Sequence, residues 1–201
     1  MNVVILDYGA GNVSSVSTAL RRLGVEATTT NKAAELVRAD RLILPGVGHC
    51  AALIHALDAQ GLRKPLADAI SRGVPFLGIC LGLQALYEAS DEAPDLAGLG
   101  LFKGNVTHLP ANVKLPHMGW NRLRPTRASV LLQNIARESY FYFAHTFAAP
   151  AAGTEGTAVC NHGREFVAVL EDKNIFGVQF HPEKSGVPGA KLLENFLRQA
   201  A

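Results

Sequence analysis

The sequence predicts an α/β fold with three layers, in which helices cover both faces of a mainly parallel central sheet. Two observations carry this prediction. Short, nearly continuous apolar runs alternate with helix-type segments over residues 1–90, which is typical of parallel strands buried on both faces. From residue 100 onward β-type runs follow one another directly, which indicates antiparallel strands in the second half. No linker, repeat or low-complexity segment interrupts the chain, so we expect a single domain over residues 1–201.

The first half contains four predicted strands and four predicted helices in alternation. The strands are the apolar or β-branched runs at residues 2–6, 25–29, 41–44 and 74–77. The helices are expected at residues 13–23, 32–39, 50–57 and 62–72. In the first of them apolar residues recur at helical spacing and Gly24 ends the pattern. A further helix-compatible run at residues 83–88 follows the fourth strand.

The second half contains six β-type runs and one amphipathic helix. The runs lie at residues 101–109, 114–123, 139–147, 157–161, 166–171 and 175–180, and the helix at 190–198. Sites in open α/β sheets lie at the carboxyl ends of the parallel strands. The glycine-rich turns at residues 7–12 and 45–48 and the segment around Cys80 are all predicted there.

Composition excludes several classes of protein. The chain is 48% hydrophobic and 18% charged with a net charge of +2, and it has no dense Lys/Arg stripe, so we expect no nucleic-acid partner. The longest uncharged stretch is too short to cross a membrane, and no signal peptide is predicted. Cys50, Cys80 and Cys160 lack metal-ligand spacing, which favours free thiols in a cytoplasmic protein. We interpret Cys50 and Cys160 as packing residues.

The most informative segment is Gly-Ile-Cys-Leu-Gly at residues 78–82, between a predicted strand and a helix-compatible run. This arrangement resembles a nucleophile elbow, in which the central residue adopts a strained conformation and the glycines allow close packing. Cys80 would then lie at the start of a helix, where free N–H groups and the helix dipole favour a thiolate. A buried structural cysteine is the alternative if this segment is taken alone.

A candidate base and its orienting carboxylate follow the last strand. His181 and Glu183 flank Pro182, which disfavours helical geometry at His181, so we expect the segment to be extended. Residues two apart in an extended segment point the same way. Glu183 would hold the imidazole tautomer while the other ring nitrogen faces the thiol.

Attack of Cys80 on a carbonyl would create an oxyanion that needs backbone donors. The N–H of Leu81 is the expected first donor, because it follows the nucleophile directly. The second is expected from the Pro-Gly-Val-Gly turn at residues 45–48, where two glycines would let the Val47 peptide reorient.

Together these motifs resemble the class I (triad) glutamine amidotransferases, which have a flavodoxin-like fold. The resemblance rests on residues 45–48, on Gly-Ile-Cys-Leu-Gly-Leu-Gln at 78–84 and on Gln-Phe-His-Pro-Glu at 179–183, and it extends from residue 2 to the last helix. One branch, the glutaminase subunits of imidazole glycerol phosphate synthase, is similar also at Asp-Tyr-Gly-Ala-Gly-Asn (7–12), at Pro-His-Met-Gly-Trp-Asn (116–121) and at Lys184-Ser185.

The resemblance implies a reaction and a set of site residues. Cys80 would attack the side-chain amide of L-glutamine, with His181 and Glu183 completing the triad, and release glutamate and ammonia without a cofactor or metal. Val47 and Leu81 would form the oxyanion hole. The remaining substrate-binding positions implied are Gly46, Gly48, Gln84 and the strand segment His145, Thr146 and Phe147. Phe147 replaces a tyrosine that is common in the family, and His49-Cys50 is a second departure.

The resemblance also implies a partner. Ammonia would pass to a cyclase subunit in a heterodimer that makes imidazole glycerol phosphate and aminoimidazole carboxamide ribotide in L-histidine biosynthesis. Asn12, Trp120, Tyr142 and Lys184 match positions that face this cyclase. Tyr8 and Met118 are interpreted as packing residues. A reorientation of the peptide at residues 46–48, triggered by the loaded partner, would switch the glutaminase on.

Three alternatives stay open at this point. One is a glutaminase that serves another synthase, such as those for pyridoxal phosphate, anthranilate or GMP; the residues at 117–121 and Lys184 argue against it. Another is a stand-alone thiol hydrolase, in which the histidine tends to follow the cysteine much sooner than His181 does here. The third is a non-catalytic binding module, which the intact Cys80, His181 and Glu183 disfavour.

Overall fold

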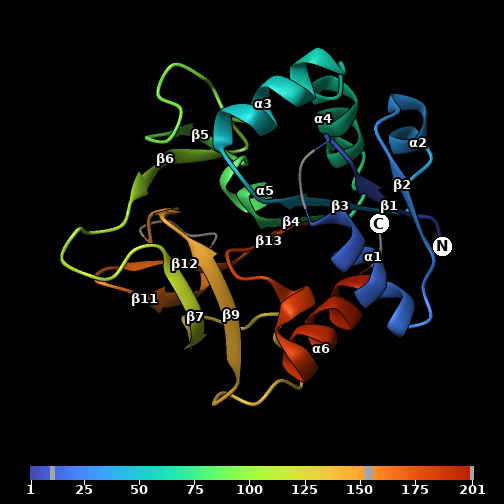
Figure 1. Cartoon of the computed structure of the whole chain (residues 1–201). Helices are drawn as coiled ribbons and strands as arrows, with labels where there is room; N and C mark the ends of the chain where they lie inside the picture. The colour runs from blue at the N-terminus through green and yellow to red at the C-terminus, as the bar shows by residue number, and fades with distance from the viewer. Residues whose placement is uncertain (10–11, 152–155, 200–201) are drawn as a thin grey trace.

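The computed structural model describes residues 1–9, 12–151 and 156–199. Its centre is an eight-stranded sheet in the order β2-β1-β3-β4-β13-β12-β11-β8 (Figure 1). The neighbours from β2 to β13 pair in parallel, and those from β13 to β8 pair antiparallel. The parallel strands are β2 (Ala27–Thr30), β1 (Val3–Leu6), β3 (Arg41–Gly46), β4 (Phe76–Cys80) and β13 (Ile175–Val178). The antiparallel ones are β12 (Glu165–Asp172), β11 (Gly156–Asn161) and β8 (Arg124–Pro125). The predicted mixed, mainly parallel sheet is confirmed.

Helices cover both faces of this sheet, as the alternation of strands and helices predicts. Strand residues point alternately to the two faces, so Val4 and Leu6 join one apolar cluster while Val3 and Ile5 join the other. The first cluster contains buried residues of α2 (Ala33–Val37), α3 (Cys50–Ala59) and α4 (Arg63–Ser71). The second contains those of α1 (Val13–Arg22) and α6 (Gly186–Leu197). Figure 1 shows α3 and α4 on one side of the sheet and α1 and α6 on the other.

Three of the predicted β-type runs form strands outside the central sheet. Residues 101–109 contribute β6 (Phe102–His108), which pairs with β5 (Tyr87–Ser90) and β10 (Phe147–Ala148). The runs at 114–123 and 139–147 pair with each other as β7 (His117–Arg122) and β9 (Tyr140–His145). We call this antiparallel pair the β7–β9 ribbon. It packs on the α1/α6 face through the buried rings of Phe141 and Phe143.

The helix-compatible run at residues 83–88 is a wrong prediction. The helix after Cys80, α5, contains only Leu81–Gln84, and β5 begins at Tyr87. The run is apolar enough for either structure, and Tyr87 is used to pair with Phe102 of β6.

Two glycines let α5 lie directly on the sheet. A Cβ atom on Gly82 would be 2.0 Å from the backbone oxygen of Leu44 in β3. A Cβ atom on Gly78 would be 2.5 Å from the backbone oxygen of Gly82. The absence of side chains at these positions therefore sets how close the start of α5 approaches β3 and β4, and with it the position of Cys80.

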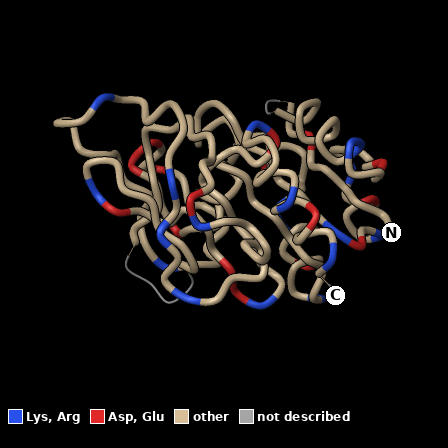
Figure 2. The backbone as a smooth tube through the Cα atoms, turned by 90° about the horizontal axis from the view of Figure 1, so that it is seen from below, with Lys and Arg blue, Asp and Glu red and all other residues tan. Residues whose placement is uncertain are grey.

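Charged residues of both signs are interspersed over the molecule, as the small net charge leads one to expect (Figure 2). Among the residues that the structure describes, no helix has the length and apolar character needed to cross a membrane. Ala10 and Gly11, in the predicted glycine-rich turn, lie outside the described residues.

Candidate active site

Cys80 has the strained backbone expected of a nucleophile elbow. It is the last residue of β4 and the residue before α5, with φ 54° and ψ −105°. A positive φ is uncommon for a residue that carries a side chain and persists only where the surroundings impose it. Cys80 is buried, and it lies opposite Gly46 in the parallel pairing of β3 with β4. The thiol thus lies at the carboxyl edge of the parallel strands.

His181 and Glu183 contact each other, although the segment differs from the prediction. His181 Nδ1 lies 2.8 Å from Glu183 Oε1, and both side chains are almost completely buried. The backbone is extended at His181, but Pro182–Lys184 form a short 3-10 helix, so the extended geometry predicted through Glu183 is wrong. Proline is well tolerated at the start of a helical turn, where its missing N–H costs nothing. The Nδ2 group of Asn12 donates a second hydrogen bond of 2.8 Å to Glu183 Oε1.

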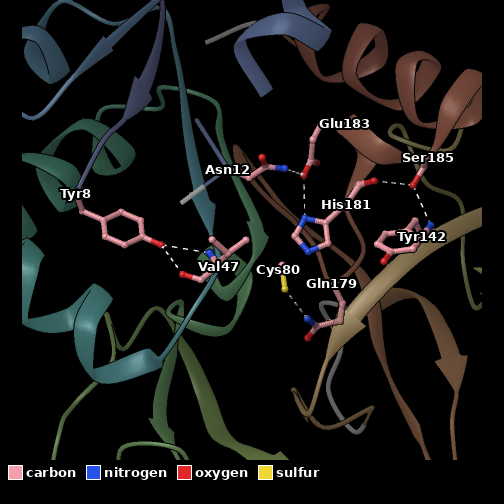
Figure 3. Close-up of polar contacts among 9 residues, drawn as sticks. All are labelled: Tyr8, Asn12, Val47, Cys80, Tyr142, Gln179, His181, Glu183 and Ser185. Atoms are coloured by element: carbon pink, nitrogen blue, oxygen red, sulfur yellow. Dashed lines mark hydrogen bonds and ion pairs between the residues drawn. The ribbon is translucent and has the colours of Figure 1, made fainter. Parts of the chain in front are cut away.

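The environment of His181 favours an imidazolium. Burial on its own lowers the pKa of this histidine, but hydrogen bonds and charges from Cys80 and Glu183 outweigh burial and raise the pKa to about 10. Figure 3 shows the ring between the carboxylate and the sulfur. A positive ring in this place stabilises a thiolate at Cys80 and is held in one orientation by Glu183.

Backbone contacts fix the position of His181 against β9. Its N–H donates to the Tyr142 carbonyl at 2.8 Å. The Ser185 hydroxyl donates to the His181 carbonyl at 2.6 Å and accepts from the Tyr142 N–H at 3.0 Å (Figure 3). The His181 backbone is therefore joined to Tyr142 of the β7–β9 ribbon by one direct hydrogen bond and by two that pass through the Ser185 hydroxyl.

A cavity of about 360 Å³ opens beside Cys80. Its volume is within the range of small-molecule sites. Its walls come from the carboxyl edge of the sheet, from α5, from the ribbon and from residues at the two ends of the 3-10 helix. The lining residues that the sequence analysis singled out are Val47, Gly48, Cys80, Leu81, Gln84, Met118, His145, Thr146, Phe147, His181 and Lys184.

The Val47 peptide is held by Tyr8, a contact that the sequence does not predict. The Val47 N–H donates to the Tyr8 hydroxyl at 3.3 Å, and the hydroxyl lies at the same distance from the Val47 carbonyl (Figure 3). Tyr8 is 4% exposed, and burial raises its pKa to about 12, so the hydroxyl stays protonated. In this structure the Val47 N–H is thus directed at a neutral hydroxyl. Gly48 after it has φ +96° and open space around its α-carbon.

The other predicted site residues lie in different places. Gly46 packs against α5, where a Cβ atom would be 2.5 Å from that of Leu81, and it is a close-packing position. Asn12, which stays a predicted partner-interface residue, donates to Glu183 within this chain. Trp120 is 56% exposed on the ribbon, its ring 5.9 Å from that of Tyr142.

Lys184 lies near the same part of the ribbon, with its ammonium 6.0 Å from the Tyr142 ring centre. Met118, interpreted from the sequence as a packing residue, is 65% exposed, so that interpretation is wrong. An alternating strand puts Met118 and Trp120 on one face, which is the pattern that could have revealed it.

Sequence reasoning missed three contributors to the site. The side chain of Gln179 reaches Cys80, that of Tyr8 reaches Val47, and that of Ser185 secures His181. It also missed a cluster of stacked imidazoles, in which the rings of His117 and His162 lie 4.2 Å apart. Gln179 and His117 belong to quoted motifs, but their contacts join segments far apart in the sequence.

The arrangement is suited to acyl transfer through a thiol. A strained cysteine at a strand-helix turn, an imidazolium beside it and a carboxylate behind the imidazolium are the parts that covalent catalysis with proton transfer requires. The cavity next to the sulfur leaves room for a small substrate.

Known proteins with similar sequence include several that share one name. Residues 4–200 match the family model described as "Glutamine amidotransferase class-I". The chain is 44% identical to the "Imidazole glycerol phosphate synthase subunit HisH" of Moorella thermoacetica, with 96% of this chain and 93% of the relative covered. It is 44% identical to that of Methanothermobacter thermautotrophicus, with 97% of each covered. The subunit of Xanthomonas oryzae pv. oryzae is 45% identical, with 99% and 98% covered.

Solved structures show the same fold at lower sequence identity. A crystal structure of a glutamine amidotransferase superposes with a TM-score of 0.78 at 20% identity, covering 98% of this chain and 97% of the other. The structure of PurLQS from Thermotoga maritima gives a TM-score of 0.75 at 21% identity, with 98% and 97% covered. The family model, the similar sequences and the shared fold all lead to the same assignment. The chain belongs to the class-I glutamine amidotransferase family.

Proposed function

We propose that the chain is the glutaminase subunit of an imidazole glycerol phosphate synthase, and that it works in the cytoplasm in L-histidine biosynthesis. It hydrolyses L-glutamine to L-glutamate and ammonia, and a cyclase subunit uses the ammonia to make imidazole glycerol phosphate and aminoimidazole carboxamide ribotide. Relatives with this subunit name match almost the whole chain at 44–45% identity. The observation that carries the chemistry is the buried Cys80 beside the His181–Glu183 pair.

The reaction follows from the positions of these groups. The Cys80 thiolate attacks the side-chain amide carbon of glutamine, and its electron pair forms the C–S bond while the carbonyl oxygen becomes an oxyanion. The oxyanion collapses, the C–N bond breaks, and His181 gives its proton to the leaving ammonia. The neutral His181 then takes a proton from water, and the resulting hydroxide attacks the glutamyl thioester. The C–S bond breaks, which releases glutamate and restores the thiolate and the imidazolium.

The oxyanion needs N–H donors in a fixed position. The Leu81 N–H, at the first residue of α5, is one proposed donor. The Val47 N–H is the second, and it has to leave the Tyr8 hydroxyl before it can serve. Gly48, with its positive φ and open surroundings, allows the adjoining backbone to move. Because of this requirement, the isolated chain would hydrolyse glutamine slowly. A partner that favours release of the Val47 N–H would raise the rate.

The exposed face of the β7–β9 ribbon is the proposed site of the cyclase. Met118 and Trp120 are large apolar side chains that are more than half exposed, and Met118 also lines the cavity. Exposed aromatic and Met side chains of this kind are enriched at protein interfaces. Tyr142 and Lys184 adjoin them, so the two subunits would enclose the route of ammonia from Cys80.

The test is the release of glutamate from glutamine by the purified chain, alone and mixed with a cyclase subunit with or without its phosphoribosyl substrate. A large rise only in the loaded mixture supports both the glutaminase and the partner. Equal hydrolysis in every mixture would keep the glutaminase and reject this partner in favour of another synthase. Cys80→Ala should abolish hydrolysis in all mixtures while the complex still forms; retained hydrolysis would reject the mechanism.

A further inference from the structure

The Gln179 side chain lies beside the proposed nucleophile, and the mechanism above does not use it. It is completely buried, and its Nε2 group lies 3.5 Å from Cys80 Sγ (Figure 3). A primary amide buried at this depth is costly unless its donors and acceptor are satisfied. The hydrogen bonds of the Gln179 amide therefore have to be accounted for group by group.

The surroundings determine which end of the amide faces the sulfur. Gln84 places one side-chain atom 2.7 Å from the Phe147 carbonyl oxygen, which can only accept, so that atom is the Nε2 amino group. The same amino group lies 3.1 Å from Gln179, which must present its oxygen there. The remaining end of Gln179, its NH₂ group, consequently donates to Cys80 Sγ.

The Phe147 carbonyl is held by a second donor. His145 Nδ1 lies 2.9 Å from it, so this histidine carries its proton on Nδ1. His145 Nε2 is then an acceptor, and His117 Nδ1 donates to it at 3.0 Å. His117 Nε2 in turn faces Asn121 Nδ2 at 3.4 Å. We call His117 and His145 the histidine pair.

The histidine pair is neutral over the working range of pH. Burial, with a smaller contribution from neighbouring imidazoles, lowers the pKa of His117 to about 4 and that of His145 to about 3. The rings of the pair pack against Phe143 and Phe166, which are apolar neighbours. Each ring therefore has a single donor and a single acceptor, and the chain of hydrogen bonds has one consistent assignment of protons.

The chain of hydrogen bonds starts on the strand that carries the exposed apolar side chains. His117 and Asn121 lie on one side of β7, and Met118 and Trp120 lie on the other, because strand residues alternate. From Asn121 the contacts pass through the histidine pair and the Phe147 carbonyl to the two glutamines and end at Cys80.

We propose that Gln179 is a positioning residue for Cys80, and that the Gln179 amide donates a hydrogen bond to the thiolate. Gln84 and the histidine pair hold this amide in its donating orientation. The inference rests on the proposed role of Cys80 as the nucleophile. A second donor to the sulfur, in addition to His181, restricts the direction of the reactive lone pair and stabilises its charge.

Kinetics of two replacements test this role. Gln179→Met keeps the volume and removes the donor, and Gln179→Glu keeps the shape but places an acceptor against the sulfur. Because a hydrogen bond to a charged group is lost, kcat should fall about 10- to 100-fold in Gln179→Met, and further in Gln179→Glu, with KM changed less than about threefold. The matched control is Gln199→Met, because the Gln199 amide donates to the Asn195 carbonyl of α6. A kcat within about twofold of wild type in Gln179→Met would overturn the proposal.

The rate at which iodoacetamide alkylates Cys80 distinguishes a positioning role of Gln179 from a purely structural one. Loosened packing would expose the thiol and speed alkylation, whereas loss of the donor that orients the sulfur and stabilises its charge slows alkylation about tenfold. Reaction at the buried Cys50 and Cys160 is subtracted with the Cys80→Ala chain. Faster alkylation in Gln179→Met overturns the proposal. If Cys80→Ala itself hydrolyses glutamine, the proposed function fails instead, so the two failures are distinguishable.

Imidazole ¹⁵N NMR tests the direction of the hydrogen bonds that run through the histidine pair. Both members of the histidine pair should be in the Nδ1–H tautomer, and both should stay unprotonated when the pH falls from 7 to 5. An Nε2–H tautomer at His145 would leave the Phe147 carbonyl to Gln84 alone and overturn this part of the proposal.

Discussion

The contact between Gly82 and β3 gives a quantitative prediction. In Gly82→Ala the new Cβ atom would be 2.0 Å from the Leu44 carbonyl oxygen and 3.0 Å from its carbon, both backbone atoms that cannot rotate away. The start of α5 and β3 must separate by at least about 1 Å, and overpacking of this kind costs about 3 kcal/mol. For a chain of this length the melting temperature should then fall by about 6–12 °C.

The same displacement acts on the active site, because Leu44 pairs with Gly78 and Gly46 pairs with Cys80 in adjacent strands. A misplacement of about 1 Å can reduce turnover about 100-fold, so kcat should fall by this order while the fold persists.

Urea unfolding followed by circular dichroism measures the stability change, and glutamate release with the loaded partner measures kcat. Gly24→Ala is the matched control: it has open space and a φ of +78°, so it carries only the cost of left-handed backbone, about 1 kcal/mol. A Gly82→Ala chain as stable as Gly24→Ala would refute the argument from close packing.

Three further predictions concern the site. Glu183→Gln should lower the pKa of His181 from about 10 and reduce kcat about 100-fold or more, visible in the pH–rate profile; an unchanged profile would mean that the carboxylate does not orient the ring. Tyr8→Phe removes the acceptor from the Val47 N–H and should raise basal glutamate release about tenfold with KM unchanged; equal or lower release contradicts a restraining role. Because the pKa of each member of the histidine pair is lowered in the folded chain, the unfolded chain binds more protons below pH 6.5, and stability should fall as the pH drops from 6.5 to 5. The fall approaches about 2.7 kcal/mol per pH unit for the pair, and urea midpoints independent of pH over this range would contradict the assignment of neutral rings.

Local patterns in the sequence predicted the parts of the site that lie within one segment. The elbow at Cys80 follows from two glycines between a strand and a helix-compatible run, and the positive φ of Cys80 confirms the strained conformation predicted there. The nearness of His181 and Glu183 follows from their spacing, although the 3-10 turn at Pro182 replaces the expected extended chain.

Contacts between distant segments could not be predicted in this way. Asn12 and Glu183 are 171 positions apart, and the bond between them depends on where α1 and the 3-10 helix pack. The pattern of β7 and β9 predicts strands but not their partners, because an alternating strand suits a central sheet and a separate ribbon equally well. The roles of Tyr8 and Gln179 depend on contacts of their polar ends with Val47 and Cys80, which belong to other segments of the chain.

At Cys80 the requirement for catalysis and the requirement for thermal stability oppose each other. Its positive φ costs of the order of 1–3 kcal/mol for any residue with a Cβ atom, and glycine alone would be relieved of it. Cys80→Gly should therefore make a chain that cannot turn over glutamine yet outlasts the parent on heating. Screens that rank variants by thermal stability alone will enrich such inactive chains. A search for stabilised variants therefore has to measure ammonia release as well as resistance to heat.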